Sequence, residues 1–253
     1  MTAYAPQAAN HFAVRTRIVV GLLFVWFTCL PSWTLAQEAK VETNVAADQI
    51  DLLRRIDLKR DVVLGEFRLE KGMLIAPTSL NARLTLQYEP PLNYDLVVDV
   101  KRPEKDGSLA LILVLDGKQV LVMLDAFWMK ASGVTLLDNL DLDAKANETA
   151  YRQPVLPVGE KTQVRFEIRG PKLKIQVGAK TILNWEGKNS RTSIPKFWAI
   201  PNAKALMIGS CTTPFEISRL ELTPVAPTTP DQTAVASPTP IAGSLAVAKI
   251  AFP

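Results

Sequence analysis

The 253-residue sequence predicts an all-β protein built as an antiparallel two-sheet sandwich. Two observations support this prediction. Apolar and polar residues alternate with a period of two over many short segments, which is the pattern of strands with one buried and one solvated face. Turn residues separate these segments regularly, while a long helical period is almost absent. We therefore expect roughly ten short strands.

The first 36 residues are typical of a secretory signal segment. Arg15 and Arg17 precede an apolar run over 18–30, and small residues stand before a cut at Gln37. An uncleaved anchor is the alternative, but this run is shorter than the roughly 17–25 residues that a membrane helix needs. We expect a secreted or periplasmic protein with no membrane segment after cleavage.

Residues 37–60 form a polar lead-in to the predicted sandwich. Ile50, Leu53 and Ile56 fall at helical spacing near its end, so we expect one short helix there. The sandwich domain is predicted over 61–224.

The strands of this domain follow from alternation and from turn chemistry. Apolar residues alternate with polar ones over 82–88 and again over 94–101. The segment 109–115 is apolar at every position, which predicts a central strand buried on both faces. Asp116 and Gly117 follow it and favour a type I′ hairpin, because both tolerate positive φ.

A second hairpin is predicted around Gly170 and Pro171, between alternating segments over 164–169 and 173–177. Further strands are expected over 181–185, 206–209 and 215–222. Proline, threonine and alanine then dominate 225–253, so we expect a disordered C-terminal tail.

Histidine occurs once, as His11 inside the predicted signal. A mature chain without histidine excludes a histidine-based triad, a histidine general base and a histidine-ligated metal. Cys211 is the one cysteine after the signal, so no internal disulfide is expected. Removing the signal leaves 27 basic and 25 acidic residues. This balance gives no basic footprint for nucleic acid.

Carboxylate chemistry on sugars needs two acidic groups about 5–9.5 Å apart. The paired Glu-x-Asp-x-x-Glu string of sandwich glycosidases does not occur in the sequence. Asp138, Asp141 and Asp143 form an acidic cluster in a predicted loop, and they are weak candidates for Ca²⁺ binding. A solvated loop is the alternative, and no other cofactor is predicted. Asn147 begins a formal glycosylation acceptor.

Aromatic residues in loops are the groups that a glycan-binding surface would use, because a sugar ring stacks its C–H face on an indole. Trp128 follows a strand end and Trp198 lies between two prolines, so both are candidate ligand contacts. Core or rim packing is the alternative for each. Trp185 ends a strand and is expected in the core. Asp125 is a further candidate site residue.

Several segments between residues 61 and 225 together resemble a known family. They are 60–74, 94–100, 124–128 with Ser132 and Gly133, 164–168, 175–182, 184–187 and 215–224. In this order they resemble the concanavalin A-like, laminin-G-like domains of bacterial exported proteins, including 3-keto-disaccharide hydrolase-like domains. The resemblance implies a jelly-roll sandwich and a carbohydrate-related role.

The absence of histidine and of paired carboxylates favours a non-catalytic module that binds a glycan or a cell-envelope polysaccharide. A hydrolase or lyase acting on 3-keto-glycosides or other glycosides is the second hypothesis, and a structural envelope protein is the third. The sequence leaves the oligomeric state and the identity of the glycan open.

Overall fold

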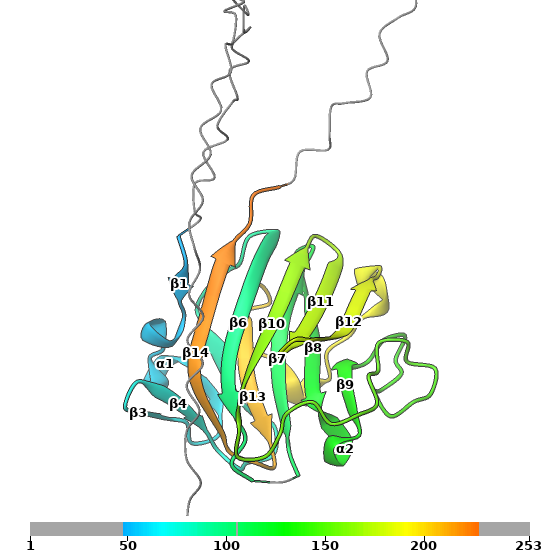
Figure 1. The fold of residues 1–253 in the computed structure, drawn as a ribbon. Coiled ribbons are helices and arrows are strands. Elements are labelled where there is room, and N and C mark those ends of the chain that lie inside the picture. The colour runs from blue at the N-terminus through cyan, green and yellow to red at the C-terminus, as the bar shows by residue number, and fades with distance from the viewer. Residues whose placement is uncertain (1–47, 105, 228–253) are drawn as a thin grey trace, which may run out of the picture. The chain divides into compact units, whose positions relative to one another are not determined.

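The computed structural model describes residues 48–104 and 106–227. The predicted signal over 1–36 and the tail from residue 228 onward lie outside these ranges. The described residues form two antiparallel sheets packed face to face (Figure 1), which confirms the predicted all-β sandwich.

The first sheet has eight strands among the described residues, in the order β12-β11-β10-β6-β14-β4-β3, with β1 paired to β14. Their bounds are β1 (Ile50–Asp51), β3 (Arg68–Glu70), β4 (Met73–Ala76), β6 (Asn93–Lys101), β10 (Lys161–Arg169), β11 (Lys172–Val177), β12 (Lys180–Glu186) and β14 (Phe215–Pro224).

The second sheet has six strands in the described ranges, in the order β2-β5-β13-β7-β8-β9. Their bounds are β2 (Val62–Leu64), β5 (Ala82–Leu86), β7 (Ser108–Leu115), β8 (Lys118–Asp125), β9 (Ala131–Val134) and β13 (Leu206–Cys211). The helical segments are short: η1 (Leu53–Arg55), α1 (Leu58–Asp61), α2 (Ala126–Met129), η2 (Asn189–Arg191) and η3 (Lys196–Trp198). None of the helices in the described ranges has the length and apolar character needed to cross a bilayer.

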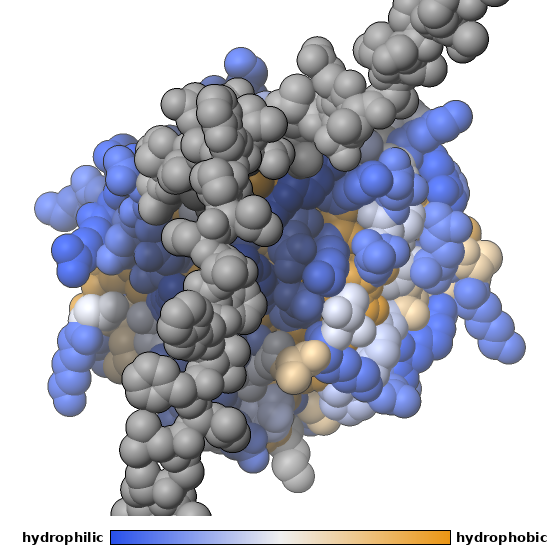
Figure 2. Space-filling view, turned by 45° about the horizontal axis from the view of Figure 1, so that its top comes forward, coloured by the Kyte–Doolittle hydropathy of each residue, from blue (hydrophilic) through white to orange (hydrophobic). Residues whose placement is uncertain are grey.

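The main core lies between the two sheets. It is filled by the inward-facing residues, which are every second residue along most strands. On β6, Tyr94, Leu96 and Val98 are buried as predicted. The polar residues of β6 lie on the outer face, where Asp95 forms ion pairs with Arg165 and Arg169 of β10. Hydrophilic residues cover most of the described surface visible in Figure 2, with apolar residues in smaller areas between them.

Strand β7 is buried at every residue, which confirms the prediction for 109–115. Leu109, Leu111 and Leu113 enter the main core. Ala110 and Ile112 point to the opposite face and join a second apolar cluster. The remaining buried members of this second cluster are Leu121, Trp198 and Met207. The chain around η3 therefore covers the outer face of the second sheet.

The predicted turns are present. Asp116 and Gly117 have φ values of 47° and 76°, as a type I′ hairpin requires, and Leu115 pairs with Lys118. At the second hairpin Gly170 has a φ of 56°, and β10 pairs with β11 in register from Arg169 and Lys172 onward.

The predicted short helix near the end of the lead-in is present only as η1 over Leu53–Arg55, and Ile50 is not part of it. Ile50 and Asp51 pair with Leu222 and Glu221 of β14 instead, because the edge of that strand offers free backbone hydrogen-bonding groups. Leu52 is the residue that enters the main core here. The sandwich therefore begins before residue 61, and the predicted boundary at this residue lies inside it.

Candidate functional site

A hollow of about 230 Å³ lies where three neighbouring strands of the second sheet meet their connecting turns. Its floor is formed by outward side chains of β7, β8 and β13, and two of them, Ser108 and Cys211, are direct cross-strand partners. Its walls come from the turns before β7, after β8 and after β13. The lining residues are Asp106, Gly107, Ser108, Met123, Ala126, Phe127, Trp128, Cys211 and Thr212. We call it the Trp128 hollow.

The wall after β8 is a turn with an unusual backbone. Asp125, Phe127, Trp128 and Met129 all have φ values between 53° and 66°, in the left-handed region. This conformation costs an L-residue other than glycine about 1–2 kcal/mol. Such a run persists only where the surrounding structure fixes it. Figure 1 shows this turn as α2, beside β9.

The Asp125 carboxylate fixes the turn from below. It is fully buried, and its two oxygens accept the backbone N–H groups of Val155 and Leu156 at 2.8 Å and 3.0 Å. The Arg102 guanidinium lies 3.1 Å from the same carboxylate and is buried too. These three partners lie far from Asp125 in sequence, so tertiary contacts hold the turn.

The backbone of Asp125 is held as firmly as its side chain. Its N–H donates to the Ser132 hydroxyl at 2.9 Å, and its carbonyl accepts the Ser108 hydroxyl at 3.4 Å. The N–H of Lys130 closes the turn on the Ala126 carbonyl at 2.9 Å. Every polar atom of Asp125 therefore has a partner within the protein.

Burial raises the pKa of Asp125, while its hydrogen bonds with Val155 and Leu156 and the charge of Arg102 act in the opposite direction. A carboxylate enclosed in this way has no face for a ligand. The prediction of Asp125 as a ligand contact is therefore wrong, because the group lies beneath the turn and positions it.

Trp128 is displayed by this turn as the sequence predicts for a loop rim. Its side chain is 72% exposed, whereas Phe127 before it is half-buried. The Lys130 ammonium lies 5.9 Å from the centre of the Trp128 ring. An exposed indole beside an apolar hollow gives a flat stacking surface at its rim.

Trp198 does not share this arrangement. It is 2% exposed and packs in the second apolar cluster against the outer face of β7 and β8. The prediction of Trp198 as a ligand contact is wrong for this reason, and the alternative of core packing is correct. Trp185 is buried as expected.

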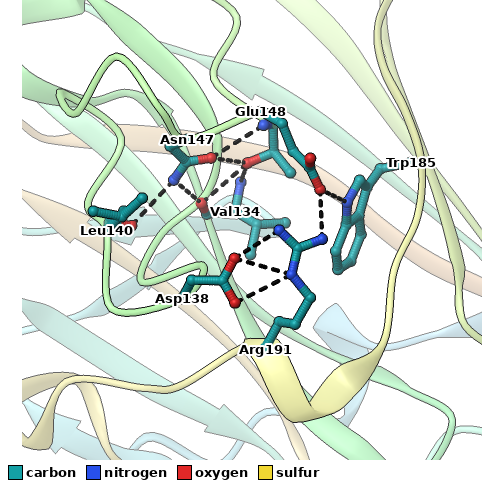
Figure 3. Close-up of polar contacts among 8 residues, drawn as sticks. Val134, Asp138, Leu140, Asn147, Glu148, Trp185 and Arg191 are labelled. Atoms are coloured by element: carbon teal, nitrogen blue, oxygen red, sulfur yellow. Dashed lines mark hydrogen bonds and ion pairs between the residues drawn. The ribbon is translucent and has the colours of Figure 1, made fainter.

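One aspartate of the predicted acidic cluster, Asp138, is held by an arginine (Figure 3). Arg191 donates to Asp138 at 2.6 Å and to Glu148 at 2.7 Å. Glu148 also accepts the indole N–H of Trp185 at 3.1 Å. The Arg191 hydrogen bond lowers the pKa of Asp138, and those from Trp185 and Arg191 lower the pKa of Glu148.

The other two aspartates of this cluster lie apart from that contact. Asp141 accepts the Thr135 hydroxyl and the N–H of Leu142, and Asp143 is exposed. Among residues 48–104 and 106–227, no three Asp, Glu, Cys or His side chains are grouped as a metal ion would require. The described structure therefore does not bring Asp138, Asp141 and Asp143 together as calcium ligands.

Asn147 is not an accessible glycosylation acceptor. Its side chain is buried, and its amide donates to the carbonyls of Val134 and Leu140 at 3.0 Å and 3.2 Å (Figure 3). Thr149 of the same motif is buried with it and accepts a hydrogen bond from the N–H of Val134. The motif fixes the loop against β9.

Sequence reasoning missed the floor of the Trp128 hollow. Met123 and Cys211 stand at outward positions near the ends of β8 and β13, where they border the second apolar cluster and also line the hollow. A period-two pattern assigns them to a face, but it does not tell which part of that face stays open.

No protein family and no curated protein matches the chain. The carbohydrate-binding module CBM66 from Bacillus subtilis is 11% identical, with 64% of this chain and 93% of that chain covered at a TM-score of 0.46. The Crh5 transglycosylase in complex with NAG is 8% identical, with coverages of 72% and 85% and a TM-score of 0.49. The alginate lyase AlyC3 is 11% identical, with coverages of 62% and 77% and a TM-score of 0.41. Likeness at this level assigns neither a ligand nor an activity to the chain.

Proposed function

We propose that the chain is an exported, non-catalytic glycan-binding module that holds its ligand at the Trp128 hollow. One observation carries this proposal: Trp128 is 72% exposed on a turn whose left-handed backbone is fixed from below by a buried carboxylate. A large indole held in water by a strained backbone is an arrangement that packing alone does not require.

The chemistry of the hollow fits a sugar. The Trp128 ring and Met123 offer apolar surface to the C–H face of a pyranose, while Asp106, Ser108 and Thr212 offer polar groups to its hydroxyls. Ligand sites combine such apolar walls with a few placed polar groups. Because the turn is already fixed, binding would not need to order it, and preorganisation of this kind favours affinity.

The same lining argues for binding over hydrolysis. The common mechanism of glycoside hydrolysis uses two carboxyl groups. Asp106 is the one carboxylate among the described lining residues. The signal segment predicted over 1–36 supports a secreted or periplasmic location, where envelope polysaccharides are available as ligands.

A glycan array probed with the purified mature protein tests this function. Trp128→Ala should weaken the strongest interaction by about 1–3 kcal/mol, the range known for bases stacked on aromatic side chains. Phe197→Ala is the matched control, because Phe197 is also an exposed aromatic residue, at 57%, and does not line the hollow. The control should bind as the native protein does.

Three results would contradict the proposal. An array without a bound glycan would exclude the binding function, and unchanged binding by Trp128→Ala would exclude this site. Turnover of a bound glycan would replace the module with the hydrolase or lyase of the second hypothesis. Loss of that turnover in Asp106→Asn would place the chemistry in the same hollow.

A further inference from the structure

A second hollow, of about 340 Å³, adjoins the same turn. Its lining residues are Arg102, Met129, Pro154, Val155, Leu156, Pro157 and Val158. Trp128 lines the first hollow and Met129, the next residue, lines the second. Successive residues are about 3.8 Å apart at Cα. The two hollows therefore adjoin one another at this turn.

The two hollows are built as one unit. The Asp125 carboxylate that fixes the turn also holds the N–H groups of Val155 and Leu156, which form a wall of the second hollow. The Ser108 hydroxyl that holds the Asp125 carbonyl belongs to the floor of the first. The relative position of the two hollows is thus set by one buried residue.

The second hollow offers surface of the same character as the first. Val158 is 39% exposed, and it lies beside Pro157 and close to Pro154 in sequence and in space. Arg102 is its one charged lining residue, and the charge is balanced by Asp125. The Nε of Arg102 is buried and has no acceptor among the described residues.

We propose that the ligand is an internal stretch of a linear neutral glycan that crosses the turn, with one sugar on Trp128 and a neighbouring sugar against Val158. This inference rests on the proposed function. A linear neutral glycan repeats apolar C–H faces and hydroxyl groups along its length. Neighbouring sugars of such a glycan could therefore place their C–H faces in the two hollows, which lie on either side of the fixed turn and carry few charged residues.

The test is the dependence of affinity on chain length, measured by calorimetry with cello-, laminari- and xylo-oligosaccharides of one to six sugars. In one series, affinity should rise about tenfold from one sugar to three and then level off; tenfold corresponds to about 1.4 kcal/mol. Val158→Asp should remove this rise and leave the affinity for the single sugar unchanged. Leu92→Asp, at an exposed leucine that lines neither hollow, should change neither value.

The outcomes separate this inference from the proposed function. Suppose that Trp128→Ala weakens binding on the array, but that affinity does not depend on chain length or that Val158→Asp has no effect. The proposed glycan-binding function then holds, and the inference that the glycan crosses the turn is wrong. If the protein binds none of the three oligosaccharide series, the inference that a linear neutral glycan crosses the turn is also wrong. A dimer in sedimentation that Val158→Asp dissociates would assign the second hollow to another copy of the chain.

Discussion

The carboxylate of Asp125 and the guanidinium of Arg102 form a buried ion pair at 3.1 Å, directly beneath the turn that displays Trp128. Neither group reaches solvent, and the carboxylate also holds two backbone N–H groups from a distant loop. Removing one member of a buried ion pair leaves the other charge without compensation, which is costly. The pair therefore links the stability of the sandwich to the geometry of the candidate site.

Asp125→Ala should lower the free energy of unfolding by about 3–5 kcal/mol, because it leaves Arg102 and two backbone donors without their partner. Equilibrium unfolding in urea measures this change. Glu160→Ala, at an exposed acidic residue of the same loop region, is the control and should change stability little. A loss below about 1 kcal/mol, the level of an exposed ion pair, would show that this pair is not enclosed.

Substitution of Trp198 and substitution of Trp128 should have very different effects on the stability of the protein, because the first residue is buried and the second is exposed. Trp198→Ala should lower the free energy of unfolding by about 3–5 kcal/mol, since it empties the second apolar cluster. Trp128→Ala should leave the thermal midpoint nearly unchanged, since most of its side chain already faces water. Equal losses from the two substitutions would contradict the assignment of one to the core and the other to the surface.

Tyr94 joins the two sheets through its hydroxyl, which donates to the Val114 carbonyl at 3.1 Å and accepts the Val114 N–H at 3.0 Å. Burial raises the pKa of Tyr94. Tyr94→Phe should cost about 1–3 kcal/mol, because it leaves buried backbone groups without a partner. Tyr88→Phe, at a half-buried tyrosine outside the strands, serves as the control in the same urea unfolding experiment. Identical midpoints for the two variants would refute the role of the Tyr94 hydroxyl.

The Arg191 contacts should make stability depend on pH in the acidic range. Asp138 and Glu148 have lowered pKa values in the fold, so their contribution is complete above their ordinary values of about 4 and is lost as pH falls through the lowered ones. The stability difference between the native protein and Arg191→Gln should therefore be constant near neutrality and shrink below about pH 4. Lys204→Gln, at an exposed lysine, should show no such change. A difference that persists unchanged to pH 2 would contradict this account.

Local patterns predicted the parts of the fold that local contacts determine. The Asp116-Gly117 turn and the alternation on β6 depend on residues near in sequence, and both are present. The double burial of β7 was predicted from its composition, but its cover was not, because the chain around Trp198 lies far away in sequence.

The site was predicted only in part for the same reason. Trp128 and Trp198 both follow loop-like sequence signals, and only tertiary contacts separate the exposed residue from the buried one. In the sequence, Asp125 is an ordinary carboxylate at the end of a strand. Its role depends on its contacts with Arg102, Val155 and Leu156, which lie far away in the sequence. Its burial therefore has no local signature in the sequence.

The indole N–H resonances of the protein give the most direct test of the central claim that Trp128 contacts a glycan. Beyond the predicted signal the chain has three tryptophans, Trp128, Trp185 and Trp198. With ¹⁵N-labelled tryptophan, Trp128→Phe identifies the Trp128 signal by its loss. Titration with the strongest-binding oligosaccharide should shift that signal in a saturable way and leave the signals of Trp185 and Trp198 in place. Saturable binding without a shift at Trp128 would contradict the account.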